Sequence, residues 1–178
     1  MTKLDSASSM PPLHVAILVL GVLAFTAVAA PDQPRAPMPV AGVWTLVAAD
    51  RVGSDGVRKP DYGAHPHGRM VVEQDGRYAT QIYSDERPRF AGGDKAHATP
   101  DELAKSVLGM SAHFGTISID VAAATLTFHI ERSAFPNWEA TEQRRHYELH
   151  GDELTYQVPA SASTDGSIAI SVWKRAPH

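Results

Sequence analysis

The segment GRMVVEQDGRYATQIYS, residues 68–84, contains two β-rich runs on either side of Asp75-Gly76. Asp-Gly between two such runs is a strong signal for a β-hairpin, because glycine adopts the positive φ that a tight turn requires. We therefore predict an antiparallel hairpin here. Further β-rich runs, most of them also separated by turn signals, occupy residues 42–50, 114–120, 125–133, 142–150, 153–158 and 167–175.

Eight strands joined mainly by hairpins predict an all-β fold in which an antiparallel sheet closes on itself, since closure removes the exposed edges. The expected architecture is an eight-stranded up-and-down barrel. A barrel of this size is wide enough for packed side chains or for one small ligand. A two-sheet sandwich is the structural alternative.

One short helix interrupts the strands. It is expected to begin at Thr99, whose side chain can cap the helix while Glu102 completes a capping box. Leu103, Val107 and Met110 then recur at helical spacing. We predict a helix with these three residues on its apolar face.

The composition excludes several classes of function. The chain has 178 residues, a formal net charge of -4 and no cysteine. The mild acidity argues against a nucleic-acid partner, and the absence of cysteine excludes disulfides, thiol catalysis and thiolate metal sites. His65 and His67 lack a third ligand at a recognisable spacing, so we expect no metal site. No sequence motif requires a cofactor, and we expect none.

The N-terminal segment differs from the rest of the chain. Lys3 precedes an apolar run at residues 15–30, and residues 27–29 form a small-x-small pattern typical of signal-peptide cleavage. The predicted organisation is a signal peptide, a Pro-rich spacer and a barrel domain, at residues 1–29, 30–40 and 41–178. Cleavage before Ala30 implies a secreted or periplasmic protein with no stable membrane insertion. The alternative is an uncleaved membrane anchor.

Three features carry a resemblance to a known family. The sequence GVW opens the first predicted strand at residues 42–44, and VWKR closes the last one. Between them, the block at residues 111–156 contains an FPNW stretch followed by paired arginines. Together these features resemble the bacterial and fungal lipocalin-like domain family over nearly all of residues 40–175. The resemblance implies a β-barrel with a central cavity, usually without an assigned activity.

The resemblance also implies a contact at one end of the barrel. Lipocalins place a basic residue of the last strand over the tryptophan of the first strand. Here Arg175 or Lys174 would cover Trp44, in a cation–π contact worth roughly 0.5–2 kcal/mol.

Strand alternation selects candidate cavity residues. In QRRHYELH, residues 143–150, the side chains of Arg145, Tyr147 and Leu149 share one face, and their apolar character predicts that this face points inward. A buried charge needs a partner. Arg145 therefore either orients an acidic ligand or forms a purely structural pair with Glu131.

In two other regions, the alternation of side chains does not determine which face points into the barrel. In TLTFHIE, either the face of Phe128 or the face of His129 points inward, and the family resemblance favours His129 inward. In the opening hairpin, a two-residue turn pairs Met70 with Gln81. We expect Gln81 to point inward and leave the orientation of Tyr78 open.

Two loops contribute further candidate ligand-binding residues. Phe90, in the long segment before the helix, either folds over the mouth of the barrel or anchors the loop outside it. In the FPNW turn, large apolar side chains either plug one end of the barrel or contact a ligand. The candidate ligand-binding residues are Arg145, His129, Tyr147, Gln81, Tyr78, Phe90, His113, Phe135, Asn137 and Trp138.

Three functions follow from this pattern. The first is an exported barrel that binds a small, mostly apolar molecule, with or without an acidic group, oriented by Arg145, His129 or Gln81. The second is a cofactor-independent isomerase or cyclase acting on a hydrophobic intermediate in the same cavity. The third is an interaction module with a filled barrel. Catalytic residues and oligomeric state are left open.

Overall fold

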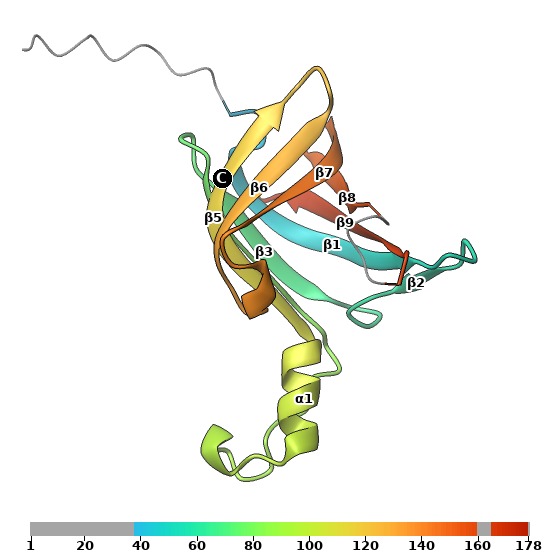
Figure 1. Cartoon of the computed structure of the whole chain (residues 1–178), viewed down its shortest axis with the longest axis vertical. Helices are drawn as coiled ribbons and strands as arrows, with labels where there is room; N and C mark the ends of the chain where they lie inside the picture. Colours follow the sequence, from blue (N-terminus) through green and yellow to red (C-terminus); the bar gives the residue numbers. More distant parts are fainter. Residues whose placement is uncertain (1–37, 160–164, 178) are drawn as a thin grey trace, which may run out of the picture. The chain divides into compact units, whose positions relative to one another are not determined.

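The computed structural model describes residues 38–159 and 165–177. Its strands form one antiparallel sheet in the order β2-β1-β3-β4-β5-β6-β7-β8-β9, and β1 also pairs with β9. Figure 1 shows these two strands side by side where the sheet closes. The strands are β1 (Gly42–Val52), β2 (Arg58–Pro60), β3 (His67–Val72), β4 (Arg77–Tyr83), β5 (Met110–Asp120), β6 (Thr125–Ser133), β7 (Thr141–His150), β8 (Glu153–Val158) and β9 (Ile168–Arg175).

The predicted all-β, eight-stranded, up-and-down barrel is confirmed, and the closing strands are β1 and β3 to β9. The short strand β2 was not predicted, because its three residues lie in a stretch with the composition of a loop. It pairs with the end of β1, at residues 50–52, beyond the part of β1 that pairs with β3. β2 therefore covers an edge of β1 that the barrel itself leaves unpaired.

The turn between β3 and β4 is one residue longer than expected. The Glu73 backbone N–H donates to the Arg77 carbonyl at 2.8 Å, and the Gly76 N–H donates to the Glu73 carbonyl at 3.0 Å. Gly76 has a φ of 88°, as the last position of a three-residue hairpin loop requires. The Asp-Gly signal located the hairpin correctly, but the two-residue turn was wrong.

This extra loop residue changes which side chains face the interior. Val72 pairs with Tyr78 and Met70 pairs with Thr80, whereas the shorter turn would have paired Met70 with Gln81. A shift of one residue moves every side chain of a strand to the opposite face. Tyr78 and Thr80 are buried and Gln81 is exposed, so the prediction that Gln81 points inward is wrong.

The end of the barrel where β1 begins is filled by side chains. Trp44 and Trp173 are fully buried there. The guanidinium carbon of Arg175 lies 4.2 Å from the centre of the Trp44 ring, and Arg175 also donates to the Ala41 carbonyl. The expected basic cover over the first-strand tryptophan is confirmed, with Arg175 in that place.

The helix α1 (Pro100–Leu108) begins as predicted. The Thr99 side chain accepts from the Glu102 N–H, and the Glu102 carboxylate accepts from the Thr99 N–H. Two short 3-10 turns, η1 (Lys95–His97) and η2 (Pro136–Trp138), are also present. Figure 1 shows α1 outside the barrel.

The end of α1 differs from the prediction. Gly109 ends the helix, and Met110 is the first residue of β5 rather than part of the helical face. No residue of α1 is buried, so its apolar face does not join the core. Among the described residues, no helix has the length and hydropathy needed to cross a membrane. The predicted signal peptide and residues 30–37 of the spacer lie outside the described residues.

Candidate functional site

A cavity of about 70 Å³ lies inside the barrel, towards the end where β5 begins. Side chains from β4, β5, β7 and β8 form its wall: Thr80, His113, Arg145 and Tyr156. Tyr62 and Trp138 are only partly buried and form the mouth of this cavity. Ordinary pockets for whole ligands enclose about 300–1,000 Å³, so this cavity fits one chemical group rather than a large molecule.

Arg145 projects from β7 into this cavity and is 5% exposed. Its guanidinium carbon lies 4.2 Å from the centre of the Phe128 ring and 5.0 Å from that of Tyr156. Its Nη2 donates to the side-chain oxygen of Gln143 at 2.6 Å. Glu131 is exposed, and no carboxylate among the described residues pairs with Arg145. The inward orientation predicted for Arg145 is confirmed, but the pairing with Glu131 is not present.

Two polar atoms in the cavity wall have no hydrogen-bond partner among the described residues. They are Nε of Arg145 and Oγ1 of Thr80. Buried polar groups in folded proteins are nearly always hydrogen-bonded, so two such atoms in one cavity need an explanation. Both can donate a hydrogen bond to a group placed between them and the mouth.

His113 is buried beside these groups and is neutral. Its Nδ1 lies 2.7 Å from the phenol oxygen of Tyr78. Burial, together with the nearby positive charge of Arg145, lowers the pKa of His113 to about 3. Burial also raises the pKa of Tyr78 well above its usual range. The imidazole and the phenol therefore carry no negative charge that could pair with Arg145.

The FPNW turn lies at the mouth of the cavity. The rings of Trp138 and His113 are in edge contact, with centres 6.0 Å apart. The rings of Trp138 and Phe135 are also in edge contact, at 5.5 Å. Phe135 and Asn137 are exposed. Trp138 thus covers the cavity, while Phe135 extends the apolar surface outward from it.

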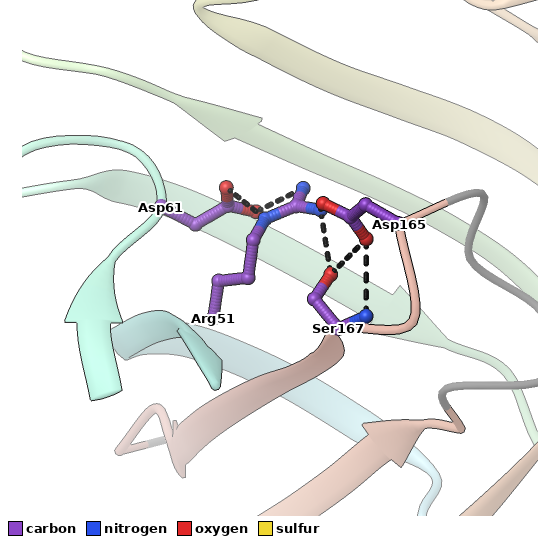
Figure 2. A network of polar contacts seen from close by, with 4 residues as sticks. All are labelled: Arg51, Asp61, Asp165 and Ser167. Carbon is purple, nitrogen blue, oxygen red and sulfur yellow. Dashed lines mark hydrogen bonds and ion pairs between the residues drawn. The ribbon is translucent and has the colours of Figure 1, made fainter. Parts of the chain in front are cut away.

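An ion-pair network lies next to the cavity, where Asp61 forms part of the lining (Figure 2). Arg51 donates to the Asp61 carboxylate at 2.9 Å and to the Ser167 hydroxyl at 3.0 Å, and it lies 3.5 Å from the Asp165 carboxylate. These contacts join β1 to the segment after β2 and to the segment before β9. Asp61 lines the cavity beside Tyr62, and Arg51 compensates its negative charge.

His129 does not reach the cavity. Phe128 is fully buried, so β6 turns His129 to the outer face. There its Nδ1 lies 3.0 Å from the Glu142 carboxylate, and its Nε2 lies 2.9 Å from the Ser118 hydroxyl. The preference for His129 inward was wrong, because burying the apolar face of β6 gains more than burying an imidazole.

The remaining candidates are spread over the barrel. Tyr147 is buried in the core, and Gln81 lies on the outer wall. Phe90 lies in the loop before α1, where the Ala91 N–H donates to Glu102 at 2.8 Å. The lining of the cavity therefore brings together three of the predicted residues, His113, Trp138 and Arg145. Tyr78 contacts His113, and Phe135 and Asn137 lie in the same turn as Trp138.

Tyr156, Thr80 and Tyr62 are among the cavity residues that were missed from the sequence. Tyr156 alternates with Leu154 in β8, so strand periodicity alone would have found it. Thr80 was missed because the hairpin register was off by one residue. Tyr62 lies in a loop, and no pattern in the sequence marks it.

Comparison with known proteins gives one result for the whole domain. A family model described as a lipocalin-like domain matches residues 41–176. A search of curated proteins finds no match.

Proposed function

The chain belongs to the lipocalin-like domain family, and we propose that its barrel binds a small, mostly apolar molecule through an acidic group held by Arg145. The proposal rests on one observation: Arg145 is a buried cation with no carboxylate partner among the described residues. A buried charge is costly unless it is paired. A carboxylate from a ligand supplies that pair.

The shape of the site favours an acidic end inside and an apolar body at the mouth. A cavity of about 70 Å³ takes a carboxylate and little more. Arg145 Nε and Thr80 Oγ1 donate to this group, and neutral His113 does not repel it. The apolar body then packs on Trp138 and Phe135.

The test compares an acid with the matching alcohol. Isothermal titration calorimetry with octanoate and octan-1-ol is carried out on the protein and on Arg145→Met. A charge-assisted hydrogen bond is worth about 1.5–3 kcal/mol. We therefore expect Arg145→Met to weaken octanoate binding about 10- to 100-fold and octanol binding less than about threefold.

Arg144→Met is the matched control, because Arg144 is the neighbouring residue on the outer face of β7. We expect it to leave both affinities unchanged. Equal weakening of octanoate and octanol by Arg145→Met would mean that Arg145 has a structural role only. The same conclusion would follow if the unaltered protein did not prefer the acid.

The hydrogen bond between His113 and Tyr78 favours a second candidate function, a cofactor-independent isomerase or cyclase. A neutral imidazole next to a phenol in an enclosed cavity can accept or donate a proton. The test incubates hydrophobic acids with small amounts of protein and examines the products by mass spectrometry and NMR. Conversion that His113→Gln abolishes would establish catalysis, whereas recovery of unchanged acids would contradict it.

We also propose that the protein is exported, on the basis of the apolar run at residues 15–30 and the small-x-small pattern that ends it. The intact mass of protein recovered from outside the cytoplasm tests this proposal. Loss of residues 1–29 would support it. Retention of these residues would favour the membrane anchor.

A further inference from the structure

The outer wall of the barrel contains a second hollow of about 440 Å³, which we name the outer groove. It runs across β3, β4, β5 and the end of β6. Two rows of paired residues on the outer face form most of it. One row is Val71, Ala79, Phe114 and Arg132, and the other is Arg69, Gln81 and Ala112.

The groove owes its depth to small side chains between larger ones. Ala79, Ala112 and Ala134 leave space in the middle of the wall. Phe114 and Val71 stand beside this space and are 47% and 37% exposed. Together these side chains give the groove an apolar floor and wall that a ligand can contact.

The charged side chains of the outer groove, Arg69 and Arg132, are both cationic. Arg69 makes no ion pair or hydrogen bond with the residues that the structure describes. Arg132 donates to the backbone carbonyl of Glu131, and its nearest carboxylate, that of Glu139, is 3.8 Å away. Both arginines occupy exposed positions at the groove, where an anion can approach Arg69 directly and Arg132 beside its long ion pair with Glu139.

We propose that the outer groove binds an apolar acid, with the apolar body on Phe114 and Val71 and the acidic group between Arg69 and Arg132. The volume lies within the range of ordinary ligand sites, about 300–1,000 Å³. The central cavity, about 70 Å³, has room only for the acidic end of such a molecule. The groove is therefore a second site, and it does not depend on the function proposed for Arg145.

The probes are 8-anilinonaphthalene-1-sulfonate and its neutral counterpart N-phenyl-1-naphthylamine, both followed by fluorescence titration. Phe114→Ser removes the largest apolar contact, so we expect it to weaken both probes about tenfold. Arg69→Gln and Arg132→Gln each remove one exposed charge. We expect each to weaken the sulfonate about two- to fivefold and to leave the neutral probe unchanged.

The controls lie outside the groove. Val47 is an exposed residue of β1, and Arg144 is an exposed residue of β7. Val47→Ser and Arg144→Gln should both leave sulfonate binding unchanged. Circular dichroism and the melting temperature verify that each variant is folded.

Three results would overturn the proposal. Binding that Arg145→Met abolishes would place the probe in the central cavity. Binding that Phe114→Ser leaves unchanged would place it elsewhere on the surface. A dimer in sedimentation velocity that Phe114→Ser converts to a monomer would show that a second copy of this chain occupies the groove.

Discussion

Replacing Arg145 with methionine removes a buried charge and keeps most of the apolar length of the side chain. Burying an ion costs several kcal/mol, whereas each of the two aromatic contacts of Arg145 returns only about 0.5–2 kcal/mol. We expect Arg145→Met to stabilise the ligand-free protein by about 1 kcal/mol, a rise of about 2–4 °C in melting temperature. Both proteins are first unfolded to release any bound ligand and then refolded. Differential scanning calorimetry of the refolded proteins measures this change. A fall of similar size would show that the protein itself compensates the charge.

His113 makes the stability depend on pH. Its pKa is about 3 in the folded protein and about 6.5 when unfolded. Between these two pH values the unfolded state binds more protons than the folded state. The free energy of unfolding therefore falls as the pH decreases from 6.5 towards 3. Above pH 6.5, His113 contributes no pH dependence. Tyr78 and Arg145 are the groups that face it.

Urea denaturation at several pH values, compared with His113→Gln, isolates this contribution. The difference between the two proteins should change by a few kcal/mol between pH 6.5 and pH 3. The other histidines and the carboxylates are present in both proteins and cancel. Parallel pH profiles would mean that His113 is not held neutral by its surroundings.

The β3–β4 hairpin shows how one glycine fixes the register of two strands. Gly76 has a φ of 88°, and a Cβ added there would lie 2.7 Å from the Ile117 carbonyl oxygen. Gly56 has a φ of 76° but would meet nothing within 4 Å. We expect Gly56→Ala to cost about 1 kcal/mol from its backbone alone and Gly76→Ala about 2 kcal/mol or more, because the collision adds to the backbone strain. Chemical denaturation of both variants makes the comparison, and equal losses would contradict it.

Local sequence signals were sufficient to predict where the helix and the hairpin lie. The length of the turn and the register of the two strands depend on contacts between distant segments. The capping box at Thr99 and the Asp-Gly turn act over a few residues, so the sequence alone identifies them. The length of that turn was not predictable, because the Gly76 carbonyl accepts from the Ile117 N–H of a distant strand at 2.7 Å. In the register that this contact accompanies, Thr80 rather than Gln81 faces the cavity.

The two ends of the barrel serve different purposes. Trp44, Trp173 and Arg175 fill and seal one end, which stabilises the fold. The other end contains His113 and Arg145 in a polar cavity that packing does not fill. Alternation along β7 was sufficient to predict that Arg145 points inward. Its lack of a carboxylate partner could be recognised only once the neighbouring strands were in place.

Native mass spectrometry of the protein and of Arg145→Met, both purified from the same cells, tests whether the buried arginine holds an acidic ligand. We expect the unaltered protein to carry an acidic small molecule, or to take up added octanoate, and the variant to carry neither. The same adduct on both proteins would contradict the role of Arg145. Absence of any adduct on the unaltered protein in excess octanoate would contradict binding in the cavity.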